Sequence, residues 1–241
     1  MTTLVVGASG ATGQLLVQQL LDQGQQVKVI VRSTHNLPSF FNTEMVSIVE
    51  ANLLDLSDAE LAHHVTGCDA IASCLGHNLT LKGLFGSPRS LVTDAVQRLC
   101  TAIKSNQPKT LVKFVLMNTT GNSNRDIPER ITFGQQCVIT LLRLLLPPHV
   151  DNEKAADYLR INIVHDDPTI QWVVVRPDNL THEATVSAYE IHPSPTRSAI
   201  FDAGITSRVN VGHFMAELIT NQDLWHQWKG KMPVIYNTSK I

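Results

Sequence analysis

The sequence predicts an α/β fold in which helices cover both faces of a parallel sheet. Short runs rich in valine and isoleucine alternate with helix-like periodicity along all 241 residues, a pattern typical of buried parallel strands joined by helices. The chain also opens with an apolar strand, a three-glycine turn and an amphipathic helix. Together these observations predict a Rossmann-like, doubly wound parallel sheet in a three-layer α/β/α arrangement, folded as a single domain over residues 1–241.

The predicted elements alternate along the chain. We expect strands at residues 4–6, 27–31, 45–49, 70–74, 114–117 and 172–175. We expect helices at residues 13–23, 58–65, 88–105, 132–146, 153–163 and 211–221, the third with Ser87 as N-cap and Pro88 at its first position. Right-handed crossovers then give the strand order 3-2-1-4-5-6, with a ligand crevice between strands 1 and 4. The irregular segment at about 181–206 is predicted to cover a substrate.

The glycine turn after the first strand predicts a dinucleotide site. Gly7 permits a tight turn, Gly10 lets the backbone approach a diphosphate, and Gly13 lets the helix pack against the strand. The diphosphate then accepts hydrogen bonds from the first N–H groups of the helix. The predicted cofactor contacts in this turn are Gly7, Ser9, Gly10, Ala11, Thr12 and Gly13.

Residues at the ends of the next strands refine the cofactor prediction. Arg32 closes the second strand with Ser33 beside it, where a guanidinium suits the extra phosphate of NADP. We expect no acidic residue nearby to bind a ribose diol, so NADP is favoured and NAD is the alternative. Asn52 and Leu53 follow the third strand, where the adenine should lie. Leu75 and Gly76 follow the fourth.

Composition excludes several other classes of function. The net charge is −2 and the pI about 6.5, so no basic field attracts nucleic acid or an anionic membrane. The most apolar run, 138–146, is too short to span a bilayer and is more typical of a core, a crevice wall, a lid or a dimer face. The spacing of Cys68, Cys74, Cys100 and Cys137 predicts neither a metal site nor disulfides. We therefore expect a cytoplasmic monomer or homodimer that acts on a small molecule and binds no metal.

Several segments resemble the atypical short-chain dehydrogenase/reductase group with NmrA-like members, and within it the flavin reductase/biliverdin reductase B type. The similar segments are 7–13, 29–33, 68–70, 176–177 and 207–215. The resemblance implies NADPH bound with its nicotinamide over strands 4 and 5, and hydride transfer to flat conjugated acceptors such as flavins, quinones or tetrapyrroles.

The chain departs from that pattern at the catalytic positions. Short-chain dehydrogenases place a serine after strand 5 and a Tyr-x-x-x-Lys on the next helix, where the lysine lowers the tyrosine pKa. Here Thr119 follows strand 5, Lys154 matches the lysine, and Val150 stands at the tyrosine position. The biliverdin reductase type has a histidine where this chain has Asp178. The usual proton donor is therefore absent.

Four residues remain as catalytic candidates by position. Thr119 is predicted to orient the substrate or the carboxamide, with Thr120 as its neighbour if the strand ends one residue later. His77 follows strand 4 and could supply protons at neutral pH. Lys154 is a candidate only because it matches the lysine of the family that the chain resembles. A literal Tyr-x-x-x-Lys at 236–240 follows the last predicted strand, outside the context that the motif requires, and is not expected to be catalytic. Cys74 is expected to be a core residue and not a nucleophile.

Three functions fit these residues. The first is an NADPH-dependent reductase of a small conjugated acceptor, such as a flavin, quinone, tetrapyrrole or carbonyl compound. Hydride transfer needs mainly alignment of donor and acceptor, so it does not require a strong acid. The second is an NADP(H)-binding redox regulator of the NmrA-like type, which the missing tyrosine permits. The third, a nucleotide-sugar epimerase or dehydratase, is disfavoured by the short chain and by the same missing tyrosine.

Overall fold

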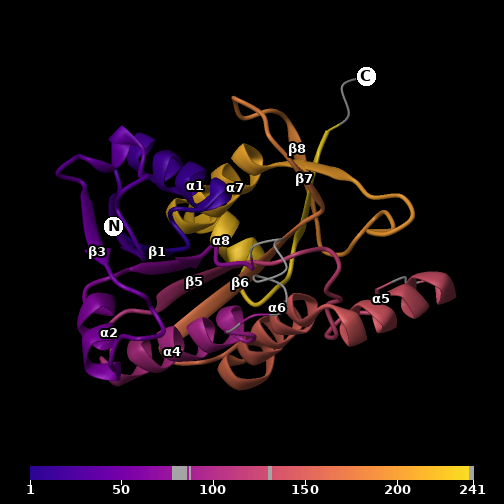
Figure 1. Ribbon diagram of the computed structural model, residues 1–241, viewed down its shortest axis with the longest axis horizontal. Helices are drawn as coiled ribbons and strands as arrows, with labels where there is room; N and C mark the ends of the chain where they lie inside the picture. Colours follow the sequence, from indigo (N-terminus) through magenta and orange to yellow (C-terminus); the bar gives the residue numbers. More distant parts are fainter. Residues whose placement is uncertain (78–85, 87, 130–131, 239–241) are drawn as a thin grey trace.

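The computed structural model describes residues 1–77, 86, 88–129 and 132–238, and its arrangement of layers is shown in Figure 1. Within these residues an eight-stranded sheet runs in the order β3-β2-β1-β4-β5-β6-β10-β8. Its strands are β1 (Thr2–Val6), β2 (Gln26–Val31), β3 (Val46–Glu50), β4 (Ala70–Ser73), β5 (Val112–Met117), β6 (Ile170–Pro177), β8 (Tyr189–His192) and β10 (Val234–Asn237). The predicted order 3-2-1-4-5-6 is confirmed, and two further strands extend the sheet beyond β6.

Helices cover both faces of this sheet (Figure 1). One face carries α1 (Ala11–Asp22), α7 (Arg208–Thr220) and α8 (Gln222–Trp228), and the other carries α2 (Asp58–Val65), α4 (Leu91–Ser105) and α6 (Pro147–Tyr158). Alternate residues of β1 divide between the two cores, since Leu4 and Val6 pack on one face and Val5 on the other. The remaining elements are the helical turns η1 (Ser39–Phe41) and η2 (Leu159–Ile163), the helix α5 (Phe133–Leu145) and a small sheet of β7 (Asn179–Thr181) and β9 (Ile205–Ser207).

Several predicted boundaries were wrong. The third helix begins at Leu91 and not at 88, and Ser90 occupies its N-cap position without a side-chain cap, while Ser87 lies outside the described residues. Asp151 of α6 supplies the cap instead, because its carboxylate accepts hydrogen bonds from the Val92 and Thr93 amides at 2.8 and 2.9 Å. The helix predicted at 153–163 begins six residues earlier, at Pro147, which suits a first helical position.

The C-terminal part holds elements that the periodicity did not predict. β10 is parallel to β6 and antiparallel to β8, so the edge of the sheet is formed by a strand within the segment predicted to be irregular. These strands have four residues each, too few to produce a readable period. Tyr236 therefore lies within a strand and does not follow the last one.

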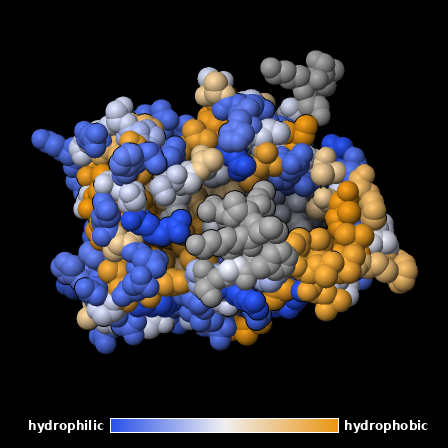
Figure 2. Space-filling model, in the orientation of Figure 1, coloured by the Kyte–Doolittle hydropathy of each residue, from blue (hydrophilic) through white to orange (hydrophobic). Residues whose placement is uncertain are grey.

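Helix α5 exposes an apolar face. The exposed side chains include Phe133, Leu141, Leu144 and Leu145 on this helix and the nearby Phe201, and Figure 2 shows apolar residues gathered at that end of the molecule. None of the helices among the described residues is long and apolar enough to cross a membrane.

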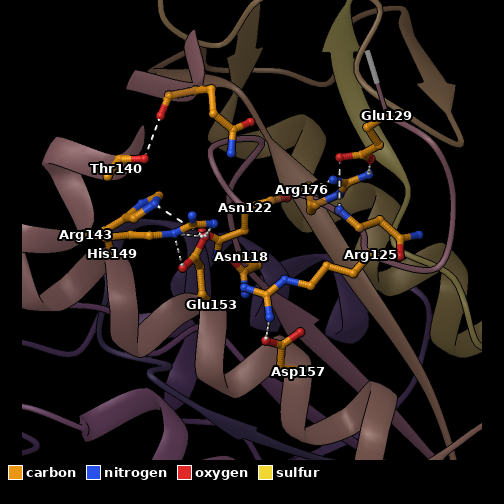
Figure 3. A network of polar contacts seen from close by, with 12 residues as sticks. Asn118, Asn122, Arg125, Glu129, Thr140, Arg143, His149, Glu153, Asp157 and Arg176 are labelled. Atoms are coloured by element: carbon orange, nitrogen blue, oxygen red, sulfur yellow. Dashed lines mark hydrogen bonds and ion pairs between the residues drawn. The ribbon is translucent and has the colours of Figure 1, made fainter. Parts of the chain in front are cut away.

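A buried ion pair joins β6 to the chain that follows β5 (Figure 3). The Arg176 guanidinium is fully buried and donates to Glu129 at 2.6 Å, to the Asn122 carbonyl at 2.8 Å and to the Met232 carbonyl at 2.8 Å. Glu129 also accepts from the Asn124 amide at 2.9 Å. These bonds hold the segment after β5 against the end of β6.

Removing Glu129 should therefore be costly. Because Glu129→Ala leaves a guanidinium buried without its counter-charge, we expect the free energy of unfolding to fall by about 3–5 kcal/mol in urea denaturation. Arg125→Ala breaks an ion pair with Asp157 in which the arginine side chain is 49% exposed and the aspartate side chain 24%. This change should lower the free energy of unfolding by less than about 1 kcal/mol. Equal losses in the two variants would contradict this account of the buried pair.

Candidate functional site

The glycine turn brings three backbone segments into contact at the carboxyl end of β1. Gly7 has a φ of +75°, and a Cβ there would lie 2.6 Å from the carbonyl carbon and oxygen of Cys74 after β4. A Cβ on Gly13 would lie 2.2 Å from the Gly7 carbonyl oxygen. Both distances are far below van der Waals contact, so only glycine fits either position. The turn therefore seats the start of α1 directly on β1 and β4.

The amino end of α1 is left open toward this edge of the sheet. Gly10 occupies the N-cap position and offers no side chain to cap the first amides. A cleft of about 330 Å³ lies beside it, formed by the ends of β1, β2, β3 and β4 and by the start of α4. An uncapped helix start at a cleft is a suitable place for a diphosphate.

Most of the predicted cofactor contacts meet in this cleft. Its lining includes Gly7, Ser9, Gly10, Arg32, Asn52, Leu53, Leu75 and Gly76. Ala11, Thr12, Gly13 and Ser33 do not line it. Of these, Thr12 is buried, Gly13 packs against Gly7, and Ser33 is exposed beside Arg32. The topology therefore gathers residues from four strand ends into one cleft.

The expectation that no acidic residue lies near Arg32 was wrong. Glu50 ends β3 in register with Val31, so it lies on the strand next to the end of β2. Its carboxylate accepts a hydrogen bond from the Thr34 hydroxyl at 2.7 Å. Arg32 lines the cleft, whereas Glu50 does not, so among the described residues the guanidinium is the charged group presented to a ligand there.

Arg98 of α4 fixes the loop that follows β3. Its guanidinium donates to the carbonyl oxygens of Leu53 at 3.0 Å and Leu54 at 2.8 Å, and also to the Leu56 carbonyl. A fork of N–H donors suits several carbonyls at once. This clamp positions Asn52 and Leu53 at the wall of the cleft.

A second and larger cavity, of about 540 Å³, lies past the carboxyl ends of β5 and β6. Thr119 and Thr120 reach it from β5, and Asp178 reaches it from β6. Helix α5 contributes Gln135, Ile139 and Leu142, so this helix forms a wall of the cavity while its other side is exposed. The remaining lining residues are Gly121, His149, Asn179, Leu180, Ala199, Ile200, Ala203 and Arg208.

The pKa values of two titratable groups in this cavity, Asp178 and His149, are shifted in opposite directions. Burial raises the pKa of the Asp178 carboxyl, although the Gly204 amide donates to it at 2.9 Å and Thr120 bonds to it as well. Burial lowers the pKa of the His149 imidazole, opposed by the charge of Glu153. Clefts that hold perturbed titratable groups are candidates for acid–base chemistry. Sequence spacing does not single out His149, which sits one residue before the position expected for the tyrosine.

The other predicted catalytic residues lie elsewhere. His77 Nε2 is 2.8 Å from the carboxylate of Asp151, and both side chains are almost fully buried. This contact joins the end of β4 to α6. Because Asp151 also caps α4, it joins the end of β4 to α4 as well. Lys154 is exposed and lines a separate hollow of about 260 Å³ with Arg89 and Arg143. The structure thus brings Thr119 and Thr120 together but places His77 and Lys154 outside their cavity.

The surroundings of Tyr236 and Cys74 give neither side chain a place in the chemistry of the Thr119 cavity. The Tyr236 ring packs against Gly204, where a Cβ would lie 2.3 Å from it, and lines a third cavity that does not include Thr119. Lys240 lies outside the described residues. Burial raises the pKa of the Cys74 thiol to about 12, so the thiol stays protonated and is a poor nucleophile.

The comparisons with known proteins agree with this geometry. A family model described as NAD(P)H-binding matches residues 7–222. Because the match spans most of the chain, the chain belongs to this NAD(P)H-binding family. The matched range begins at Gly7, at the start of the glycine turn.

Solved structures share the fold over the whole chain. The oxidoreductase ylbE from Lactococcus lactis is 19% identical, with a TM-score of 0.69 over 100% of this chain and 92% of that one. A wide-type short-chain dehydrogenase/reductase from Veillonella parvula, solved in complex with NADP, is 15% identical, with a TM-score of 0.69 over 99% and 95%. A candidate NADH-flavin reductase from Streptococcus pneumoniae is 16% identical, with a TM-score of 0.65 over 99% and 100%. At these identities the likeness is one of fold.

The close contact at Gly13 predicts the effect of a single added methyl group. Gly13→Ala forces the first turn of α1 away from the Gly7 carbonyl, and we expect a loss of about 1–3 kcal/mol in urea denaturation. Gly76→Ala adds the same group where no atom of the described residues lies within 4 Å and should change stability by less than about 0.5 kcal/mol. An unchanged midpoint for Gly13→Ala would show that the turn is looser than described.

Proposed function

We propose that this protein is an NADPH-dependent reductase that transfers a hydride to a small conjugated acceptor, such as a flavin, quinone, tetrapyrrole or carbonyl compound. The observation that carries the proposal is the presence of two cavities at the same edge of the sheet. One lies at the glycine turn, and the other lies at Thr119 and Thr120. In open α/β sheets, ligands bind outside the carboxyl ends of the strands. The finer likeness to the flavin reductase/biliverdin reductase B type supports the same class of acceptor.

The cleft at the glycine turn is assigned to the cofactor. The first amides of α1 bind the diphosphate, Arg32 binds the phosphate on the adenosine ribose, and Asn52 and Leu53 contact the adenine. The nicotinamide supplies the hydride when it is bound. Leu75 and Gly76 line the cleft just after β4, and β4 pairs with β5, the strand that precedes Thr119.

The larger cavity is assigned to the acceptor. Thr119 Oγ1 accepts a hydrogen bond from the Gly121 amide at 3.2 Å, which fixes the hydroxyl at the cavity wall. From there it orients the acceptor. Ala199, Ile200 and Ala203 come from the segment 181–206, which we propose covers the acceptor and excludes water. We propose that the protein does this work in the cytoplasm as a monomer or homodimer.

The activity is tested by following NADPH absorbance with flavin, quinone, biliverdin and aldehyde acceptors. Turnover with at least one of them, saturable in both substrates, is the expected result. Tight NADPH binding with no turnover for any acceptor would overturn the reductase and favour the redox regulator. The observation behind that second function is that no tyrosine lines the larger cavity among the described residues, so the usual proton donor of short-chain dehydrogenases is missing.

The cofactor preference is tested at Arg32. Because a charge-assisted hydrogen bond to a phosphate contributes about 1.5–3 kcal/mol, Arg32→Glu should raise the Kd of NADPH by roughly 10- to 100-fold and change that of NADH much less. Glu50→Gln is the matched control and should leave NADPH affinity nearly unchanged. Equal losses for both coenzymes in Arg32→Glu would remove this residue from the ribose site.

The role of Thr119 is tested by removing its hydroxyl. Thr119→Val keeps the shape of the side chain but loses the hydrogen bond, so kcat should fall roughly tenfold while the Kd of NADPH stays nearly the same. Thr119→Ser restores the hydroxyl and should recover most of the rate. If the valine variant turns over as fast as the parent protein, the hydroxyl has no orienting role.

A further inference from the structure

Reduction of a carbonyl, quinone or flavin needs a proton as well as a hydride, and the acceptor cavity contains a histidine that could supply it. His149 projects into this cavity from α6. Its ring atoms Cε1 and Nδ1 lie 3.5 and 3.8 Å from the point that a Cβ on residue 121 would occupy. Thr119 Oγ1 lies 3.7 Å from the same point. The imidazole edge and the threonine hydroxyl therefore flank one spot above the Gly121 backbone, where the missing side chain leaves room for a ligand atom.

The other side of the imidazole faces a fixed carboxylate. His149 Nε2 is buried and lies 3.6 Å from Glu153 Oε1, one helical turn further along α6. Arg143 of α5 holds that carboxylate with three hydrogen bonds of 2.8–3.1 Å. Figure 3 shows the arginine and the histidine converging on Glu153 from the two helices. At 3.6 Å the carboxylate makes an ion pair with the protonated imidazole and not a hydrogen bond, so its negative charge stabilises the protonated form.

We propose that His149 is the proton donor of the reaction, oriented by the Glu153–Arg143 pair; this rests on the proposed reductase function. The hydride from NADPH, with its electron pair, forms a new bond to the electrophilic carbon or nitrogen of the acceptor. The protonated imidazole gives its Nδ1 proton to the oxygen or nitrogen of the acceptor that receives the displaced electron pair. The Nδ1–H bond breaks with its electrons left on the ring, NADP⁺ is released, and solvent reprotonates the imidazole.

Charged groups around His149 set the pH at which it can act. Burial, the strongest influence, lowers its pKa; Glu153 raises the pKa and Arg143 lowers it. Asp178 and Arg208 are the other charged groups that line the same cavity. The sum of these effects holds the pKa of His149 below the ordinary histidine value of about 6.5. An acid must be protonated to act, so kcat should be highest at low pH and fall as the pH rises through the His149 pKa.

The test combines a pH profile of acceptor reduction with an NMR titration of the imidazole. His149→Gln should lower kcat by roughly 100-fold at low pH and abolish the decline of kcat with rising pH, with the Kd of NADPH unchanged because His149 does not line the cofactor cleft. His226→Gln, on an exposed histidine of α8, is the control and should keep the parental profile. Circular dichroism checks that each variant is folded.

Variants of the supporting pair give shifts of predictable sign. Glu153→Gln removes a negative charge and should move the NMR pKa and the kinetic pKa of His149 downward. Arg143→Gln removes a positive charge and should move both upward. If His149 only packed, these charge changes would move its NMR pKa but leave the kinetic pKa in place.

The outcomes separate this inference from the function on which it rests. If the parent protein reduces an acceptor and His149→Gln keeps the parental rate and pH profile, the proton donor is wrong and the reductase stands. If the NMR pKa moves but the kinetic pKa does not, His149 is also excluded as the donor. If no acceptor is reduced by the parent protein, the proposed function fails, and the role of His149 fails with it.

Discussion

The contact between the backbones of Gly7, Gly13 and Cys74 is the constraint on which the rest of the site depends. It places the start of α1 against the adjacent ends of β1 and β4, closer than any side chain would allow. The open amides of the helix then face a cleft lined by four strand ends. A helix held further from the sheet would still bury its apolar stripe, but it would not present its positive end at that cleft.

A second set of buried polar contacts extends this framework to the acceptor cavity. The carboxylate of Asp151 accepts from the first amides of α4 and lies 2.8 Å from His77, so a single side chain of α6 joins the end of β4 to α4. The Arg176–Glu129 pair similarly fixes the segment after β5. Buried charges are stable only when they are well paired. The Asp151 contacts and the Arg176–Glu129 pair therefore fix the positions of the segments that carry the cavity lining.

The sequence was sufficient for the parts of the fold that have strong periodicity or a steric requirement. The strand order from β3 to β6 and the glycine turn belong to this class. It was insufficient where long-range partners decide. The cap of α4 comes from Asp151, which lies in α6 and is 59 residues from Val92, so the local Ser87-Pro88 pattern predicted the wrong start. Glu50 lies near the end of β2 only because β3 pairs with that strand.

His149 shows the same limit at the candidate site. Judged by spacing alone, Val150 occupies the tyrosine position and no proton donor is present. Helix α6 begins at Pro147, so His149 lies in its first turn. There its imidazole lies near Thr119 and Gly121. The Pro-Pro pair was visible in the sequence and could have indicated an earlier helix start. With that start, Glu153 could have been predicted as the neighbour of His149 one helical turn away. Arg143 could not, because its contact depends on how α5 packs against α6.

The central claim is that the turn and the strand ends form a dinucleotide site, and calorimetric titration with NADPH tests it most directly. On protein shown to be folded by circular dichroism, the account predicts saturable binding of one NADPH per chain, tighter than that of NADH. A titration that shows no saturable binding of either coenzyme would contradict it.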